Sequence, residues 1–328
     1  MAERKTGKVI YRRALSPVLE IFRLAPEEGS PFPDYKSGQF LALSRDNCRL
    51  TKKIPSPDGS AGYTYEVDEQ GQIKRGTVTH SYSIASAPTE TRQRGYLEFY
   101  VVLELIKIET PGRLSESLFE VNPEVDNKVH YINKITGEFT LEKRAAGSKN
   151  IIMVGTGTGL APFASMMKQL YYDALDGTVH PARFTLFHAN RTLKELGYHD
   201  ELRSIEASEK LDFVYVPSVS RPGSNEKDNP HLGFGRANNV LRSVLGMPLQ
   251  EEELAQTARR EHGDTARADA AVRRAVEPRL PRQLRGEDLR ERIISESSVI
   301  LACGNPLLMG DVRHIAGQNS IRVEMEEW

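Results

Sequence analysis

The chain has 328 residues, about twice the usual length of one domain, which predicts two domains. Hydrophobic residues make up 39% of the chain and charged residues 27%, as in ordinary globular proteins. Lys and Arg number 44 and Asp and Glu 45, so the chain has no general positive field and we expect no nucleic-acid partner. The two cysteines, Cys48 and Cys303, exclude a disulfide scaffold and any four-cysteine zinc or iron–sulfur site.

The N-terminal sequence, MAERKTGKVIYRRAL, lacks the apolar core of a signal peptide, and no run reaches the ~20 apolar residues of a membrane span. We therefore expect a cytoplasmic protein without a membrane partner and without a metal site. If the protein handles electrons, its carrier has to be an organic cofactor, because there are too few cysteines to hold a cluster.

Short β-rich runs separated by Gly, Pro and Asp dominate the first ~145 residues. Strands are expected over 19–25, 39–43, 63–67 and 96–106. A short helix is expected over 113–121. Many short strands with little helix predict an antiparallel barrel or sandwich. Residues 44–79 read as an elaboration of that barrel and include a hairpin around Gly71.

The pattern changes at Lys149, after which strands alternate with helices. The sequence NIIMVGTGTG begins as a buried strand at 150, and further strands are expected over 183–189, 212–220, 298–304 and 321–325. Helices are expected over 162–175 and 193–205. This alternation predicts a parallel sheet with helices on both faces. We place the two domains at 1–146 and 147–328.

Residues 251–292 fit neither pattern. The segment holds ten acidic residues and ten arginines but no lysine and no aromatic residue. Short solvated helices, broken at Gly263, Pro278 and Pro281, are the expected form. We interpret residues of about 248–292 as a charged helical insertion in the second domain that contributes little to either core.

A glycine-rich turn, GTGTGLAPF at 155–163, follows the buried strand and opens a helix. Glycine at 155, 157 and 159 allows the backbone to turn sharply and to approach a diphosphate closely. The helix N-terminus directs free N–H groups at such an anion, and Pro162 suits the first helical turn. The candidate contacts are Thr156, Gly157, Thr158, Gly159 and Pro162. The alternative is a tight strand–helix turn without a ligand, and the spacing is not that of the G-x-G-x-x-G fingerprint.

Three motifs in order, HSYSIASAP (80–88), GTGTGLAPF (155–163) and ACGNPLLMGDV (302–312), resemble the ferredoxin–NADP⁺ reductase superfamily. KSGQF (36–40), GRLS (112–115) and VEMEEW (323–328) add to the resemblance, which covers nearly the whole chain. It implies an N-terminal antiparallel β-barrel that binds FAD and a C-terminal α/β domain with a five-stranded parallel sheet that binds NADP(H). The insertions at 44–79 and 248–292 depart from the family pattern.

The family's R-x-Y-S motif implies that Tyr82 stacks on the flavin and that the Ser83 hydroxyl lies near flavin N5. His80 replaces the Arg that contacts the FAD diphosphate, so a protonated imidazole or another cation, such as Arg75, has to take its place. The further FAD-binding positions that the resemblance implies are Ile84, Ala85, Tyr100, Val102, Gly112, Leu114 and Ser115.

The resemblance also implies a nicotinamide site near the C-terminus. Cys303 matches the family's cysteine beside the nicotinamide ring, and Gly304 permits close approach of that ring. Glu324 matches a near-terminal carboxylate, so Ser83, Cys303 and Glu324 are the expected catalytic residues. The alternatives are a buried core cysteine and a solvated acid at the sheet edge. Glu326 stands where the family has a Tyr, and we expect Trp328 to cover the flavin instead.

Dinucleotide choice rests on SVSRPG (218–223) and FGRANN (234–239). The resemblance implies that Ser220, Arg221 and Arg236 surround the 2′-phosphate of NADP(H), a dianion that suits guanidinium groups. Asn238 stands where an aromatic residue usually stacks on adenine. Arg191 is a further candidate for the phosphates. The alternative is that these arginines are surface residues.

The leading hypothesis is an FAD-dependent enzyme that passes electrons from NADPH to a separate carrier protein, ferredoxin or flavodoxin, by hydride transfer at flavin N5. A second hypothesis is the reductase component of a multicomponent oxygenase, or a free-flavin reductase. A third, of another class, is a flavin-binding electron-transfer subunit or sensor that is active only inside a complex.

Overall fold

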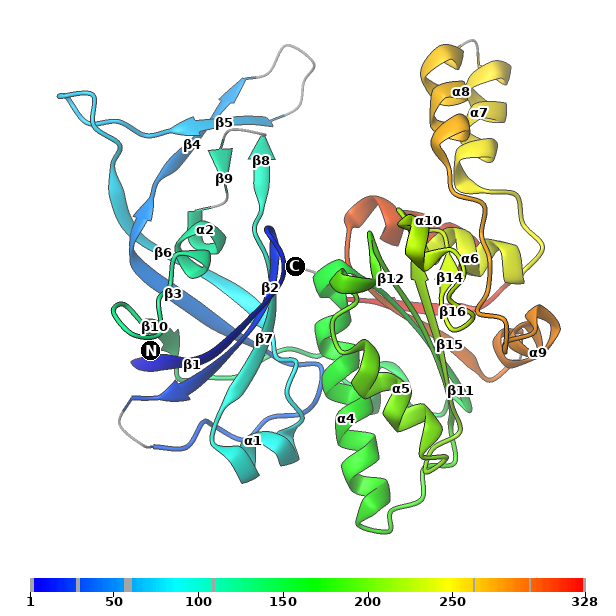
Figure 1. Cartoon of the computed structure of the whole chain (residues 1–328), viewed down its shortest axis with the longest axis horizontal. Coiled ribbons are helices and arrows are strands. Elements are labelled where there is room, and N and C mark those ends of the chain that lie inside the picture. Colours follow the sequence, from blue (N-terminus) through cyan, green and yellow to red (C-terminus); the bar gives the residue numbers. More distant parts are fainter. Residues whose placement is uncertain are drawn as a thin grey trace. The chain divides into compact units, whose positions relative to one another are not determined.

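The structure is a computed structural model that describes residues 3–27, 30–55, 61–107, 110–111, 113–261, 263–294 and 296–326. It divides into two compact units, Met1–Glu138 and Phe139–Trp328 (Figure 1). None of the helices in these described ranges is both long enough and apolar enough to cross a membrane.

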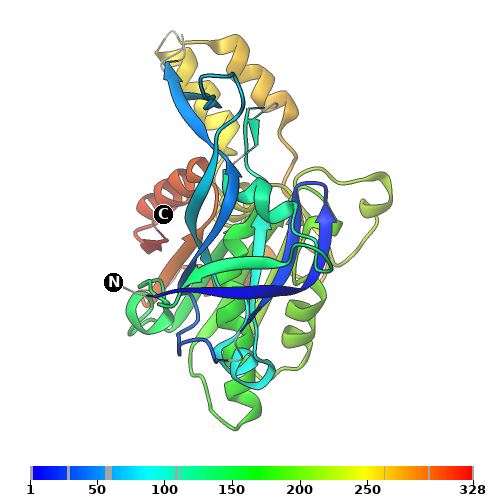
Figure 2. The same cartoon turned by 90° about the vertical axis from the view of Figure 1, so that its left-hand side faces the viewer.

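The first unit is built on a six-stranded antiparallel sheet in the order β6-β3-β10-β1-β2-β7. Its strands are β1 (Arg4–Ser16), β2 (Leu19–Pro26), β3 (Phe40–Arg49), β6 (Arg75–Ser83), β7 (Leu97–Val102) and β10 (Lys128–Ile132). The outer strands β6 and β7 meet at the Ile84–Phe99 bridge, where the Ala85 N–H also donates to the Glu98 carbonyl at 2.8 Å. The sheet therefore curls into the expected antiparallel barrel (Figure 2).

Alternation along the strands accounts for the core of this barrel. Leu41 and Leu43 on β3 and Leu97 and Phe99 on β7 are fully buried in one cluster. The cluster also takes Leu114 from helix α2 (Arg113–Phe119), which packs on β3. Short elements complete the unit, namely α1 (Pro88–Arg94), β4 (Thr51–Pro55), β5 (Ala61–Tyr65), β8 (Leu105–Lys107) and β9 (Thr110–Pro111).

The elaboration expected over 44–79 consists of the end of β3, the β4–β5 hairpin and the return into β6. The hairpin expected around Gly71 is present. Val67 and Ile73 form a bridge, and Gly71 takes a φ of 79° in the turn between them. Glycine suits this position because other residues rarely adopt a positive φ.

The second unit contains a parallel sheet in the order β14-β13-β12-β11-β15-β16. Its strands are β11 (Asn150–Thr156), β12 (Arg183–Asn190), β13 (Phe213–Val219), β14 (Gly233–Phe234), β15 (Ser298–Cys303) and β16 (Arg322–Met325). Five of them are the predicted strands. The sixth, β14, has only two residues, which is too short for a periodic pattern to predict it.

Helices cover both faces of this sheet, as predicted. Helices α6 (Ala237–Val244), α9 (Gly286–Ile293) and α10 (Pro306–Gln318) share one apolar cluster with alternate residues of the strands. Helices α4 (Ala161–Leu175) and α5 (His199–Ala207) lie together on the other face (Figure 1). The helix expected over 193–205 is two pieces, a 3₁₀ turn at Leu193–Glu195 and α5, because Tyr198 between them is left-handed, with a φ of 61°. A short helix α3 (Leu141–Arg144) precedes the sheet.

The charged insertion has two parts. Helices α7 (Gln250–Arg260) and α8 (Thr265–Arg274) lie side by side and extend away from the sheet of this unit in both views (Figure 1 and Figure 2). Gly263 lies in the turn between the two helices, as expected, and no residue of α8 is buried.

The second part of the insertion is core, so the prediction that 251–292 contributes little to either core is wrong there. Leu289 on α9 is 2% exposed and packs in the cluster beneath α6. Arg279 and Phe234 exchange two backbone hydrogen bonds of 2.8 and 3.0 Å, which attach the chain before α9 to β14. The sequence did not indicate this contribution to the core, because the segment has few apolar residues and they are spaced among arginines.

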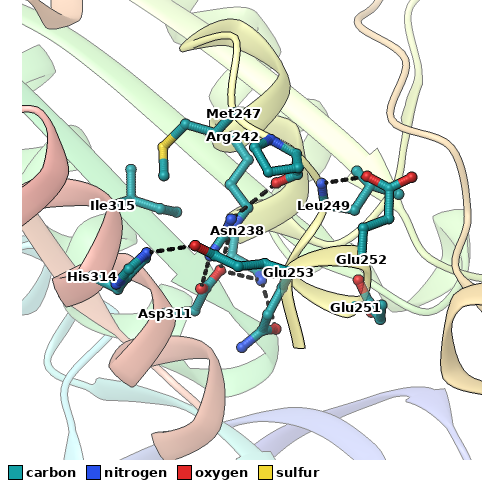
Figure 3. Close-up of polar contacts among 12 residues, drawn as sticks. Asn238, Arg242, Met247, Leu249, Glu251, Glu252, Glu253, Asp311, His314 and Ile315 are labelled. Atoms are coloured by element: carbon teal, nitrogen blue, oxygen red, sulfur yellow. Dashed lines mark hydrogen bonds and ion pairs between the residues drawn. The ribbon is translucent and has the colours of Figure 1, made fainter. Parts of the chain in front are cut away.

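A buried ion pair anchors the start of the insertion (Figure 3). The Arg242 guanidinium on α6 is 1% exposed and donates to both carboxylate oxygens of Asp311 on α10. Glu253 on α7 accepts from the same guanidinium at 2.7 Å, and His314 contacts the other oxygen of Glu253 at 3.2 Å. Burial opposes the charge, yet the two carboxylates raise the pKa of Arg242, so the guanidinium stays charged.

Two leucines of the insertion test this division. Leu289→Ala should lower the free energy of unfolding by about 2–5 kcal/mol, because it leaves a cavity in the core. Leu254→Ala on α7, where the leucine is 58% exposed, should change it by less than about 0.5 kcal/mol. Urea denaturation of the two variants is the measurement. Similar losses in both would contradict the assignment of α9 to the core.

Candidate functional site

The turns after β11 and β15 lie against each other at the carboxyl end of the second unit's sheet. These strands are direct neighbours, with Gly155 opposite Cys303. A Cβ on Gly159 would lie 2.3 Å from the Cys303 carbonyl oxygen, and one on Gly304 would lie 2.1 Å from Thr156 Oγ1. Both positions therefore require glycine. Ligands of open parallel sheets bind at this edge.

The glycines of the 155–159 turn are required for different reasons, although the sequence analysis gave them a single one. Gly157 has a φ of 56°, and an added Cβ would meet no atom within 4 Å, so its surroundings are open. Gly159 instead lies under the neighbouring turn. Thr156 Oγ1 accepts the Asn305 N–H at 3.3 Å, while Thr158 is half-buried and Pro162 is buried in the first turn of α4. Open space and backbone freedom at Gly157 are what close approach of a ligand requires.

The two carboxylates near the end of the chain, Glu324 and Glu326, have different partners. Cys303 Sγ donates to Glu326 Oε2 at 3.0 Å, and burial together with this carboxylate raises the pKa of the thiol well above its usual value. Glu324, on β16, instead accepts from Arg144 Nη1 at 3.0 Å. Cys303 is thus a neutral hydrogen-bond donor rather than a nucleophilic thiolate.

The three residues expected around a 2′-phosphate, and Arg191, the further candidate for the phosphates, lie at the ends of three adjacent strands. The Ser220 N–H donates to the Asn190 carbonyl at 2.9 Å, and the Arg221 N–H donates to the Arg191 carbonyl at 2.8 Å. Gly235, which precedes Arg236, donates to the Val219 carbonyl at 3.0 Å. These backbone bonds bring Arg191, Arg221 and Arg236 to one end of the sheet, and all three side chains are exposed. Such a cluster suits a phosphate.

Arg236 differs from the other two arginines in having an anionic partner. Its Nη1 lies 3.2 Å from Glu251 Oε1 at the start of α7. Asn238, where the family has an aromatic residue, is fully buried and donates to Gln250 and Asp311 at 3.0 and 2.8 Å. It is therefore part of the α6–α7–α10 network and is turned away from the exposed surface.

In the first unit, the residues expected around the flavin gather where β6 ends. Tyr82 is half-buried on β6 opposite Leu41, and Ser83 is 6% exposed opposite Phe40. The Ser115 hydroxyl on α2 accepts the N–H of Glu104 at 3.1 Å, which ties α2 to the segment after β7. Of the remaining expected positions, four are buried and one, at the end of β7, is 37% exposed; they are Ile84, Ala85, Tyr100, Leu114 and Val102.

The electrostatics around His80 reveal a cation that the sequence reasoning missed. Desolvation by neighbouring groups lowers the pKa of His80, and the charge of Arg113 lowers it further, against a smaller opposite effect of Glu104. The charge of Arg113 therefore acts on the imidazole. Arg75 is at the other end of β6, opposite Arg49, and donates to the Asn47 carbonyl. Arg113 lies inside the GRLS motif and could have been found there.

Two expected site residues, Gly112 and Trp328, lie outside the described residues. Sequence reasoning also missed Glu251, in the charged segment, which contacts Arg236, and Asn239, on α6, which contacts Glu251.

The phenol of Tyr82 stays neutral, because burial raises its pKa and Glu104 adds to that effect.

The packing of the two turns is testable with a matched pair of substitutions. Gly159→Ala should lower the free energy of unfolding by about 1–3 kcal/mol or more, because its Cβ would overlap the Cys303 carbonyl. Gly310→Ala, in the exposed middle of α10 with no atom near its Cβ, should raise it by about 0.5–1 kcal/mol. Chemical denaturation measures both. Equal effects would show that the turns have room to move apart.

Comparison with known proteins shows which proteins the chain is similar to. Residues 153–232 match the family model of the oxidoreductase NAD-binding domain. The chain is 32% identical over 188 residues to a flavodoxin/ferredoxin–NADP reductase of Buchnera aphidicola subsp. Baizongia pistaciae, covering 53% of this chain and 69% of that protein. It is 30% identical over 194 residues to methane monooxygenase component C of Methylosinus trichosporium, covering 59% of this chain and 49% of that protein.

The fold also matches a solved structure. A ferredoxin NADP⁺ reductase from Neisseria gonorrhoeae, crystallised with FAD and NADP, has a TM-score of 0.57 and 18% identity, with 99% of each chain covered. The chain spans about half the length of the curated relatives it matches first. The extent and identity of the match to the Buchnera reductase, together with the shared fold, decide the classification. The chain belongs to the ferredoxin–NADP⁺ reductase superfamily of oxidoreductases.

Proposed function

We propose that this chain is an FAD-dependent oxidoreductase that transfers electrons from NADPH to a ferredoxin or flavodoxin. The observation that carries the proposal is the arginine cluster at the carboxyl ends of β12 and β13. Arg191 and Arg221 are joined through their backbones there, beside Ser220. A 2′-phosphate is a dianion with several acceptor oxygens, and it suits two exposed guanidinium groups and a hydroxyl.

The residues of the second unit fit a dinucleotide. The open turn at Gly157 and the N-terminus of α4 would hold the diphosphate, with Thr156, Thr158 and Pro162 beside it. Cys303 and Gly304 would face the nicotinamide, with the thiol held protonated and oriented by Glu326. Glu324, fixed by Arg144, is the second carboxylate that we assign to this site.

The residues of the first unit fit a flavin. Tyr82 offers a neutral, half-buried ring for stacking, and Ser83 offers a hydroxyl to hold a proton near flavin N5. Arg113 and His80 would meet the diphosphate, with Ser115 and the backbone of α2. Bound FAD would supply the two-electron and one-electron redox chemistry that the side chains themselves lack.

The 30% identity to methane monooxygenase component C favours a second candidate, the reductase component of an oxygenase. That candidate shares the flavin and nicotinamide sites and differs in the electron acceptor. The acceptor therefore discriminates between the two.

The function is tested by anaerobic titration of the purified chain. We expect a yellow protein whose visible flavin absorbance is lost on adding NADPH and is lost more slowly with NADH. Subsequent addition of oxidised ferredoxin or flavodoxin should restore the absorbance. Restoration only by an oxygenase component would select the second candidate. A protein that binds no FAD, or is reduced by neither nucleotide, would refute the proposal.

FAD affinity should report which cation meets the diphosphate. Because the pKa of His80 is lowered, its imidazole is neutral at pH 7, and protonation should tighten FAD binding only as the pH falls below ~6.5. His80→Gln should abolish that acid-side gain and leave affinity at pH 8 unchanged. Arg113→Gln should weaken binding about tenfold at every pH.

Fluorescence titration of the flavin-free protein with FAD measures these affinities. Arg75→Gln is the control, because it removes a cation from the same strand at the end away from His80. Weaker FAD binding in Arg75→Gln with none in Arg113→Gln would reverse the assignment.

A further inference from the structure

A carboxylate of the charged insertion lies in the arginine cluster. Glu251, in the first turn of α7, is 8% exposed. Its Oε1 contacts Arg236 Nη1 at 3.2 Å, and its Oε2 accepts from Asn239 Nδ2 at 2.8 Å. Asn239 is 2% exposed, so one oxygen of this carboxylate is bound by a buried amide and the other by the exposed guanidinium of Arg236.

The position of Glu251 does not depend on Arg236. The backbone N–H of Gln250 donates to Asn239 Oδ1 at 3.0 Å, and the Gln250 side chain accepts from Asn238. One turn later, Glu253 is bound to the buried Arg242 at 2.7 Å. These contacts fix the start of α7 on α6, so the Glu251 carboxylate stays in place when the 56% exposed side chain of Arg236 moves.

The other two arginines of the cluster are not neutralised in this way. Among the residues that the structure describes, neither Arg191 nor Arg221 has a carboxylate within ion-pair distance. Only Arg236 does. A phosphate entering the cluster therefore finds two available guanidinium groups and a third that is already paired with an anion.

We propose that Glu251 is a specificity-determining residue: an internal carboxylate that competes with the 2′-phosphate of NADP(H) for Arg236. The proposal rests on the proposed function, because it takes the arginine cluster as the 2′-phosphate site. A bound phosphate has to break the contact between Arg236 and Glu251 or accept the nearby negative charge. Either effect weakens binding of the phosphorylated dinucleotide, while a free 2′-hydroxyl meets no such penalty. The insertion thus lowers the ratio of the affinity for NADPH to the affinity for NADH.

The test uses the full chain with its flavin and two fragments that contain no nicotinamide. Isothermal titration calorimetry with 2′,5′-ADP and with 5′-AMP isolates the contribution of the 2′-phosphate. Glu251→Gln keeps the size of the side chain and an acceptor for Asn239 but removes the charge. It should bind 2′,5′-ADP about tenfold more tightly and leave 5′-AMP binding unchanged.

The matched control is Glu252→Gln, which removes the same charge from the next residue of α7. Glu252 accepts the Leu249 N–H at 2.9 Å, and glutamine preserves that cap. This control should change the affinity for either fragment less than about twofold, because it touches none of the arginines. Equal gains in both variants would mean a general charge effect and would overturn the proposal.

A second comparison leaves α7 untouched and serves if Glu251→Gln is poorly folded. Arg221→Ala should weaken 2′,5′-ADP binding about tenfold, and Arg236→Gln should weaken it at least as much, because it leaves the Glu251 carboxylate unneutralised beside the phosphate. No loss of 2′,5′-ADP affinity in Arg236→Gln would place Arg236 and Glu251 outside the phosphate site and would overturn the proposal. If the fragments bind equally well to every variant, this inference fails and the enzyme assignment stands. If neither fragment binds to the wild-type chain, the proposed function fails with it.

Discussion

The buried ion pair between Arg242 and Asp311 is the constraint on which the arrangement of α6, α7 and α10 depends. A guanidinium that is 1% exposed has to be neutralised and hydrogen-bonded, because an unpaired charge is very unfavourable away from water. Asp311 and Glu253 meet that need from α10 and α7, and Pro248 adds a backbone carbonyl at 2.9 Å. Three helices are thereby held in one arrangement. The exposed residues at the start of α6 and α7 inherit their positions from it.

Two features position the residues at the carboxyl edge of the parallel sheet. At its centre, the turns after β11 and β15 are so close that Gly159 and Gly304 cannot carry a side chain. Towards β14, the backbone bonds between successive strand ends gather three arginines from segments that are distant in sequence. The first feature is set by close packing and the second by strand order. Together they place an open glycine turn and three exposed arginines at the same edge of the sheet.

The carboxylates of Glu324 and Glu326 have different hydrogen-bond partners, and one of them is the Cys303 thiol. The Glu326 carboxylate accepts a hydrogen bond from the Cys303 thiol. Burial and this carboxylate both disfavour the thiolate, so the sulfur remains a donor over the physiological pH range. Glu324, two residues earlier, faces Arg144 instead. Side-chain alternation along β16 and the chain after it does not by itself assign these partners.

Sequence alone determined the two-part organisation and the antiparallel and parallel sheets, because these follow from local periodicity. It missed β14, which is too short for a pattern, and it took the α9 region for a solvated insertion, since its buried Leu289 lies among arginines. Only the tertiary structure decided which charges meet. The contacts of Glu326 with Cys303 and of Glu251 with Arg236 join separate elements, and the charge of Arg113 acts on His80 from another element. These partners depend on packing and strand order, which a linear pattern of charges does not encode.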